Sequence, residues 1–468
     1  MEMEVKKNMW GYEVTTSSDA CISAINSYYL QVLGYRRERS VILEAPAHDP
    51  NCVLGNILAA YFLCSSDHSL AAAHLLAAKN RLQQATGYEK EVFDAFNCLI
   101  SHDIDDDVAL ELFSKLLKEF PRDLVSLKRA QVLCFFMGRP DLSLNVVQQV
   151  LPENENENYI YGMLSFALLE VGRMKDAEKA ARKGFQINKE DSWAQHGLCH
   201  VLQYECRFKE AVEFMEDCSR SWGSLLSFMV THNWWHVALC YLEGNAPMRK
   251  VMEVYDHCIW KELERSDGMA AEVYLNAVGL LLRVKVRGEI DTFGDRLKIL
   301  AGCLADQAFW HLEWHLDVLT AWALASTGAF DKGEDLLKAL KYKISKMSKK
   351  KQQRMQRGML LAEALYQYGK GNYKEALDLL GPDFDVNNCK IIGASDEQLD
   401  VFNEVWYVML LNTGQAEKAI EVIKMQLKKR KGVPFLWRLL ERGYSMLGRP
   451  EATAAGEKAK YLETAYFT

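Results

Sequence analysis

A recurring 34-residue step constrains the fold of this chain more than any other feature of its sequence. Short sequences typical of turns occur at Gly138, Gly172 and Cys206, and each of these residues lies 34 positions from the next. The same step separates Gly414 from Gly448 near the C-terminus. A stretch with the helical spacing of apolar residues precedes each turn. A fixed period of this length indicates an array of repeats in which each unit packs on its neighbours.

Small residues follow these turns at a constant distance. Ala177 and Ala211 stand five residues after the second and third turns, and Ala419 stands five after Gly414. A small residue early in a second helix lets the two helices of a hairpin approach closely. A helix-turn-helix unit of about 34 residues is the tetratricopeptide period. The sequence therefore predicts an all-α solenoid of tetratricopeptide-like helical hairpins, curled into a compact right-handed superhelix.

The register varies along the chain. In the middle we expect turns at Gly244, Gly288, Gly328 and Gly371, whose wider spacing predicts longer helices or loops. No Pro/Ser-rich linker divides the sequence. We therefore predict one α-solenoid over residues 1–468, with irregular hairpins over 1–100, regular 34-residue repeats over 101–225, longer irregular hairpins over 226–380 and C-terminal repeats over 396–468.

Composition narrows the partners and the compartment. A net charge of −7 argues against a nucleic-acid partner, because phosphate binding needs a basic surface. No apolar run reaches the roughly 18 residues of a membrane span, so no membrane is expected. The start of the chain lacks the apolar core of a secretory signal. The 12 cysteines are scattered without a C-x-x-C pair, which suits a reducing compartment. We expect a cytoplasmic protein.

Histidines in pairs are the chemically most distinctive feature. Two residues four apart on a helix lie on one face, one turn above the other. The three pairs of this spacing are His196/His200, His232/His236 and His311/His315. Each pair precedes its predicted turn, so we expect it on the first helix of a hairpin. In tetratricopeptide arrays the first helices line the concave face.

The words around these pairs resemble the tetratricopeptide repeat protein 38 family, and most of all its plant members. The matching words run nearly from end to end, and residues 232–239 (HNWWHVAL) are the most diagnostic. Others are residues 10–16, 165–172, 193–201, 276–283 and 393–402. The resemblance implies an all-helical, tetratricopeptide-like superhelix, and it implies no established reaction.

The chain departs from the family at several of these words. The family often has Asp where this chain has Asn276, and His and Arg where it has Asp396 and Leu399. A Phe-x-Asp-x-His motif of the family corresponds to residues 311–315 of this chain. An acid is kept there at Glu313 and the final histidine at His315. These changes imply different partners or a different specificity if the family's chemistry runs through those positions.

Three interpretations of the histidines stay open. Imidazoles four residues apart are a common pair of zinc ligands. However, the zinc-protease helix needs Glu directly after the first His, where this chain has Asn233. We therefore predict no metal and no cofactor. The second interpretation is a metal-free site, because histidine is the usual general acid and base. The third is structural, since His and Trp supply bulk with one polar tip.

Our leading prediction is a scaffold that binds a protein, peptide or small-molecule ligand in its concave channel. The alternative is an enzyme that acts on a small molecule in an enclosed pocket by histidine acid–base chemistry, without metal. Its candidate catalytic residues are His196, His200, His232, His236, Glu313 and His315. Candidate ligand-binding residues are Trp193, Asn233, Trp235, Asn276, Trp314 and Asp396. Phosphate-loop, dinucleotide and serine-hydrolase motifs are absent from the sequence.

Overall fold

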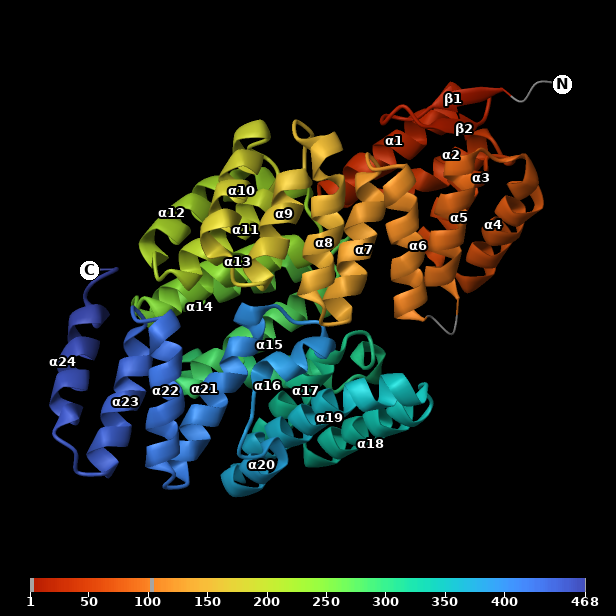
Figure 1. Cartoon of the computed structure of the whole chain (residues 1–468). Coiled ribbons are helices and arrows are strands. Elements are labelled where there is room, and N and C mark those ends of the chain that lie inside the picture. The colour runs from red at the N-terminus through yellow and green to blue at the C-terminus, as the bar shows by residue number, and fades with distance from the viewer. Residues whose placement is uncertain (1–3, 102–104, 468) are drawn as a thin grey trace. The chain divides into compact units, whose positions relative to one another are not determined.

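Helices make up most of the described chain (Figure 1). The structure is a computed structural model, and it describes residues 4–101 and 105–467. Neighbouring helices pack in hairpins, such as α9 (Ile160–Glu170) with α10 (Met174–Ile187) and α23 (Pro434–Met446) with α24 (Glu451–Glu463). The predicted all-α fold of tetratricopeptide-like hairpins is confirmed.

The chain divides into two compact units, Met1–Gly197 and Leu198–Thr468, and the division falls inside α11 (Ser192–Tyr204). The first unit contains β1 (Val5–Lys7), β2 (Glu13–Thr15), α1 (Asp19–Leu33), η1 (Arg39–Leu43), α2 (Glu44–His48), α3 (Val53–Leu63), α4 (His68–Arg81), η2 (Leu82–Gln84), α5 (Gly87–Ile100), α6 (Asp106–Glu119), α7 (Leu124–Phe136), α8 (Pro140–Val150), η3 (Leu151–Asn154), α9, α10 and the start of α11. The prediction of one continuous solenoid stays a prediction.

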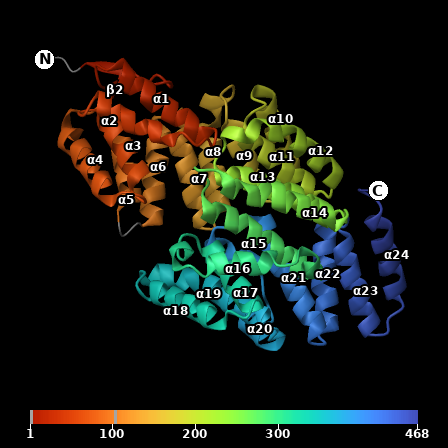
Figure 2. The same ribbon diagram turned by 180° about the vertical axis from the view of Figure 1, so that it is seen from behind.

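The second unit begins within α11 and continues to the C-terminus (Figure 2). Its elements are α12 (Phe208–Cys218), η4 (Ser219–Ser224), α13 (Ser227–Glu243), α14 (Met248–Val254), the π-helical turn η5 (Tyr255–Ile259), η6 (Trp260–Glu264), α15 (Ala270–Val286), η7 (Ile290–Phe293), α16 (Arg296–Leu304), η8 (Gln307–Phe309), α17 (Trp314–Ser326), α18 (Phe330–Ser345), α19 (Lys349–Gly369), α20 (Tyr373–Leu380), η9 (Val386–Ile392), α21 (Asp396–Asn412), α22 (Ala416–Lys429), α23 and α24.

A short β-hairpin near the N-terminus was not anticipated from the sequence. Strands β1 and β2 pair antiparallel, with Val5 opposite Thr15. The turn between them includes Gly11, whose φ of 84° lies in the left-handed region that suits glycine. Three-residue strands are too short to produce the alternating pattern by which strands are found in a sequence.

Left-handed backbone conformations mark the hairpin turns. Gly138 and Gly172 have φ of 64° and 78°, and Cys206 takes the equivalent place with φ of 61°. The turn expected at Gly244 is displaced by one residue, because Gly244 has φ of −83° whereas Asn245 has φ of 60°. Asparagine tolerates this conformation better than other non-glycine residues, so the prediction of glycine there was wrong by one position.

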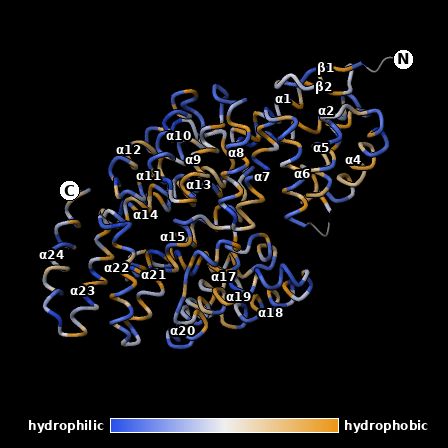
Figure 3. Tube along the Cα trace, in the orientation of Figure 1, coloured by the Kyte–Doolittle hydropathy of each residue, from blue (hydrophilic) through white to orange (hydrophobic). Residues whose placement is uncertain are grey.

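Three helices of the second unit are apolar nearly all round and are buried accordingly. They are α13, α15 and α17, and a helix without a polar face belongs in a protein interior. In Figure 3 most helices instead alternate hydrophobic and hydrophilic residues along the trace. Polar residues on the three helices are buried with them, including Asn276, Arg283 and Asp317, each 2% exposed or less. Their partners define the candidate site, because buried polar groups require hydrogen bonds.

Among residues 4–101 and 105–467, the structure contains no helix with both the length and the apolar character that crossing a membrane requires.

Candidate functional site: a buried imidazole cluster

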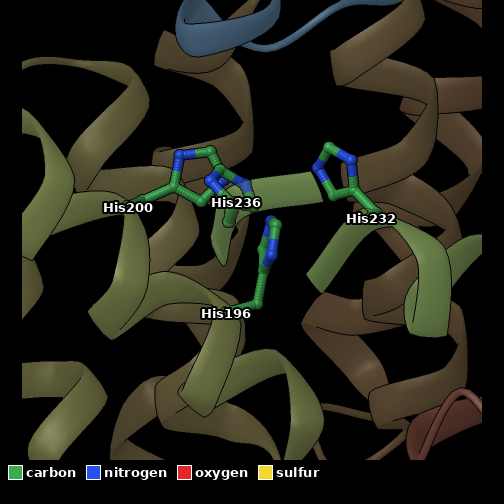
Figure 4. Close-up of side chains that lie close together, drawn as sticks. All are labelled: His196, His200, His232 and His236. Atoms are coloured by element: carbon green, nitrogen blue, oxygen red, sulfur yellow. The ribbon is translucent and has the colours of Figure 1, made fainter. Parts of the chain in front are cut away.

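Two helices carry the histidine pairs at the centre of the candidate site. His196 and His200 lie one turn apart on α11, and His232 and His236 lie one turn apart on α13 (Figure 4). All four side chains are buried, with exposed fractions between 0% and 3%. Their helices are the first helices of successive hairpins, because each lies before a turn, at Cys206 and at Asn245.

Three of these imidazoles, His200, His232 and His236, belong to the second unit and converge there. Each brings a ring nitrogen within 4.8 Å of the other two. The ring centroids of His200 and His236 are 4.3 Å apart, and those of His232 and His236 are 4.9 Å apart. We call these three residues the imidazole cluster.

A glutamine fixes the orientation of His236. Nδ1 of His236 lies 2.8 Å from the side-chain oxygen of Gln203, on α11. The amide nitrogen of Gln203 donates to the carboxylate of Glu243 at 3.2 Å, so the amide oxygen must face the imidazole. Therefore Nδ1 of His236 carries the proton, and Nε2 is left with its lone pair.

An asparagine from α15 does the same for His232. Nδ1 of His232 lies 2.8 Å from the side-chain oxygen of Asn276. The amide nitrogen of Asn276 donates to the Thr231 hydroxyl at 2.9 Å and to the carbonyl of Glu272 at 3.1 Å. The Glu272 carbonyl only accepts, so the amide orientation is fixed and His232 also holds its proton on Nδ1.

A carboxylate from α21 stands beside the third imidazole. Nδ1 of His200 lies 2.6 Å from Oε2 of Glu397, and Glu397 is 5% exposed. Burial opposes ionisation of Glu397, yet the adjacent His200 imidazole holds the pKa of that carboxyl below its usual range. Arg283 also donates a hydrogen bond to the main-chain oxygen of Glu397.

Burial keeps the neighbouring imidazoles neutral. Desolvation is the main cause that lowers the pKa of His232 to about 4, although Asn276 opposes this shift. Desolvation likewise lowers the pKa of His315 to about 3, with further contributions from His232 and Arg283. At neutral pH both rings are therefore uncharged.

The predicted helical pair His311/His315 is wrong. Helix α17 begins at Trp314, and His311 lies before it with a left-handed φ of 66°. The main-chain N–H of His311 donates to both oxygens of Asp317, at 3.0 and 3.2 Å, which holds the chain away from a helical path. Only His315 lies on the helix, where it is 3% exposed.

The candidate acid Glu313 occupies the N-cap position of α17. Burial and the neighbouring Glu272 and Asp317 raise the pKa of Glu313 to about 7. Nδ1 of His315 has no hydrogen-bond partner among the described residues. Glu313 therefore makes no hydrogen bond to Nδ1 of His315.

The candidate aromatic residues do not gather in one place. Trp235 stacks on His232, with ring centroids 5.2 Å apart and planes 9° apart. Trp193 stacks on His196 within the first unit, with centroids 4.7 Å apart. Trp314 is half-buried at the start of α17. Among them, Trp235 contacts the imidazole cluster directly, and its ring centroid is 4.9 Å from that of His236.

The remaining ligand-binding candidates differ in their surroundings. Asn233 is fully buried on α13, between the two histidines of the HNWWH word, and Asn276 holds His232. Asp396 lies near the surface, where its carboxylate is 37% exposed and 2.6 Å from Nζ of Lys390. The structure therefore brings Asn276 to the cluster and gives Asp396 a lysine partner at the rim.

Three residues of the site were missed in the sequence. Gln203 and Glu397 position imidazoles, and Arg283 lies with its guanidinium carbon 5.7 Å from the Trp235 ring centroid. Two of them, Arg283 and Glu397, stand inside family words, which was an available signal. Gln203 lies seven residues after His196 on α11, hence on a similar face of the helix.

Arg283 is incompletely satisfied despite being 1% exposed. Its Nε and Nη1 atoms have no hydrogen-bond partner among the described residues. Glu404 lies at 4.0 Å from Nη1, beyond hydrogen-bonding distance. A buried guanidinium with spare N–H donors is suited to a carboxylate or phosphate, whose paired oxygens match its fork.

Comparisons with known proteins leave the function open. No family model matches the chain. Similar solved structures include a human IFIT1 dimer with m7Gppp-AAAA, at 14% identity and a TM-score of 0.41 over 96% of this chain and 91% of that one. The TPR domain of P58(IPK) has 13% identity and a TM-score of 0.22 over 81% of this chain and 98% of that one. At these values the similarities bear on neither ligand nor reaction.

Proposed function

We propose that this protein is a tetratricopeptide-like ligand-binding protein whose ligand is a small anionic molecule, and that it acts on this molecule by proton transfer at the imidazole cluster. The observation that carries the proposal is the shared tautomer of His232 and His236. Both rings hold their proton outward on Nδ1 and keep a basic Nε2 in a buried interior.

A purely structural role accounts poorly for this arrangement. A structural histidine needs only space to fill and hydrogen-bond partners for its ring, because an unmet polar group in an interior costs about 1–3 kcal/mol, and it need not lie beside two other oriented imidazoles. Here three side chains lie at the Nδ1 atoms of the three rings and orient them: Gln203, Asn276 and Glu397. Such orientation is what a reaction requires of its acid–base groups.

The anionic character of the ligand follows from Arg283. Its spare donors lie beside Trp235, which in turn contacts His232 and His236. A carboxylate or phosphate bound to Arg283 would place the remainder of a small molecule against the Trp235 ring. The reacting atom would then lie near the imidazole cluster, within the reach that general acid–base catalysis requires.

A groove for an extended peptide would have a different character. Peptide-binding arrays need an exposed lining of polar side chains. The imidazole cluster is instead 0–3% exposed, and its neighbours Asn276 and Arg283 are also buried. We therefore propose the alternative of the sequence analysis, an enzyme that acts on a small molecule by histidine acid–base chemistry, in place of the leading prediction of a scaffold.

A thermal-shift screen of small carboxylates and phosphates tests the proposal. Wild type should be stabilised by a ligand of the panel, by about 2.7 kcal/mol at a concentration one hundred times its Kd. His236→Ala and Arg283→Met should each lose that response while keeping a native circular-dichroism spectrum. Arg442→Met, at an exposed arginine, is the matched control and should keep it. An unchanged response in both site variants would contradict the proposal.

A further inference from the structure

The imidazole cluster has the composition of a metal site. Its three potential ligands are all imidazoles, on two adjacent first helices, with ring nitrogens within 4.8 Å of one another. Figure 4 shows the rings of His200, His232 and His236 lying close together. Tetrahedral zinc with Zn–N distances of about 2.0–2.1 Å requires nitrogens roughly 3.3 Å apart, so the nitrogens would have to draw together from the 4.8 Å within which they lie.

The surroundings of the rings provide the stronger support. A metal-ligating histidine nearly always directs its other ring nitrogen to an oxygen acceptor, which fixes its tautomer and raises its basicity. Two rings have such an acceptor at Nδ1, Gln203 at 2.8 Å for His236 and Asn276 at 2.8 Å for His232. For the third ring, Nδ1 of His200 lies 2.6 Å from a carboxylate oxygen of Glu397, at ion-pair distance. On each ring Nε2 is the nitrogen on the other side from these oxygens.

These acceptors are themselves held by a further layer of contacts. The Gln203 amide is tied to Glu243, which Arg430 holds with two bonds of 2.9 and 2.8 Å. The Asn276 amide is tied to Thr231. A fixed outer layer of this kind prepares ring orientations before an ion arrives.

We propose that His200, His232 and His236 bind one divalent transition-metal ion through their Nε2 atoms, and that Zn²⁺ is the ion that fits best. Neutral imidazoles suit Zn²⁺, Co²⁺ and Ni²⁺, whereas Mg²⁺ and Ca²⁺ prefer oxygen ligands. Three protein ligands leave a fourth position open, which is the pattern of catalytic zinc sites.

This inference rests on the same residues as the proposed function and adds an ion to it. If bound, the ion would supply Lewis-acid activation of a water molecule, and His200, His232 and His236 would then serve as its ligands and not themselves as bases. Our sequence prediction of no metal used only the residues next to each histidine in the sequence, such as Asn233, whereas the side chains beside the rings come from α11, α15 and α21.

A second group of potential ligands offers an internal contrast. Glu243, Asp400 and Glu404 also place oxygens within 4.8 Å of one another. Arg430 contacts both Glu243 and Asp400, while Arg287 binds Glu404 through two hydrogen bonds. Guanidinium groups already neutralise these carboxylates, so we expect no ion there.

Titration of chelator-treated protein with Zn²⁺ alone tests the inference. Calorimetry should give one equivalent of Zn²⁺ for wild type, and Co²⁺ should give the visible absorption of a tetrahedral site. His232→Gln and His236→Gln should each weaken binding at least 100-fold. Glu397→Gln, at a positioning residue, should weaken it by about 10–100-fold.

Controls separate the site from adventitious binding. His257→Gln, at an exposed histidine on the second unit, should bind Zn²⁺ as wild type does. Wild type that binds no Zn²⁺, or a His232→Gln/His236→Gln double variant that binds it equally well, would overturn the inference. Because this titration uses no organic ligand, a failure here leaves the small-molecule screen as a separate result.

Discussion

The second unit buries two sets of polar side chains that differ in their chemistry. One is the imidazole cluster. The other is an arginine–carboxylate network, formed by Arg430 with Glu243 and by Arg287 with Glu404. Helix α13 contributes to both, through His236 and Glu243, which lie seven residues apart on nearly the same face.

The two groups differ in their chemistry. In the network, both oxygens of Glu243 accept from Arg430, and both oxygens of Glu404 accept from Arg287. In the cluster, three imidazoles bring ring nitrogens within 4.8 Å of one another, and amide oxygens orient two of the rings. Paired charges hold helices together, whereas oriented imidazoles are suited to binding or reaction.

The largest expected loss of stability comes from removing an arginine of the arginine–carboxylate network. Arg430→Met leaves Glu243 as a buried charge without its partner, which costs about 3–5 kcal/mol of the free energy of unfolding. Urea denaturation followed by circular dichroism measures this loss. The exposed Arg442→Met should stay within about 0.5 kcal/mol of wild type.

A double variant tests whether the charge itself is responsible. Arg430→Met combined with Glu243→Leu removes both charges and should recover much of the loss, because apolar replacements of a buried pair are often neutral. A loss below about 1 kcal/mol in Arg430→Met would show that the network does not hold the unit together.

A buried carboxylate without a guanidinium partner should show the opposite pH dependence from Glu243. Burial raises the pKa of Asp317 from 3.8 to about 7, while Arg430 overcomes burial and lowers the pKa of Glu243. The folded state thus keeps a proton on Asp317 that the unfolded state releases. Its contribution to stability is therefore full below the unfolded pKa of 3.8 and is lost as the pH rises to about 7.

The variant that tests this is Asp317→Asn, because its side-chain amide has nearly the shape of the carboxyl group and stays uncharged at every pH. Its unfolding free energy should exceed that of wild type by an amount that grows from pH 4 to pH 7, by roughly 3 kcal/mol at 1.4 kcal/mol per pKa unit. Glu243→Gln should be less stable than wild type over the same range, since the Glu243 contribution is lost only as the pH falls through its lowered pKa. Parallel curves for wild type and Asp317→Asn would refute the shift.

The fold was readable from the sequence because repeat packing is local. Each 34-residue step encodes a helix, a turn and a second helix, and neighbours in sequence are neighbours in space. Cys206 illustrates how far this goes, since its register identified a left-handed turn at a residue other than glycine. The displaced turn at Asn245 and the β-hairpin of residues 5–15 escaped, because neither leaves a periodic signal.

Only part of the candidate site could be predicted from the sequence. Helical spacing brought out His200, His232 and His236, because four residues make one turn. It could not reveal that Glu397, nearly two hundred residues further on, lies 2.6 Å from His200. It also misjudged His311, since the hydrogen bonds to Asp317 that pull its backbone out of the helix depend on tertiary structure.

Removing a side chain from the imidazole cluster should lower the free energy of unfolding less than removing one from the arginine–carboxylate network. His236→Ala leaves the side-chain oxygen of Gln203 without its donor, which costs about 1–3 kcal/mol and strands no charge. His257→Ala, at an exposed position, serves as the control. The unfolding free energies of these variants and of Arg430→Met, measured under one condition, give the comparison. A larger loss in His236→Ala than in Arg430→Met would reverse our assignment of roles.

The smallest effect separates two adjacent carboxylates at the edge of the cluster. Asp396 is 37% exposed and paired with Lys390, so Asp396→Asn should change stability by less than about 1 kcal/mol. Glu397, one residue later and 6% exposed, orients His200, so Glu397→Gln should weaken Zn²⁺ binding where Asp396→Asn does not. Zinc titration of both variants measures this. Equal weakening would mean that general negative charge attracts the ion, and that the contact between Glu397 and His200 has no special part in holding it.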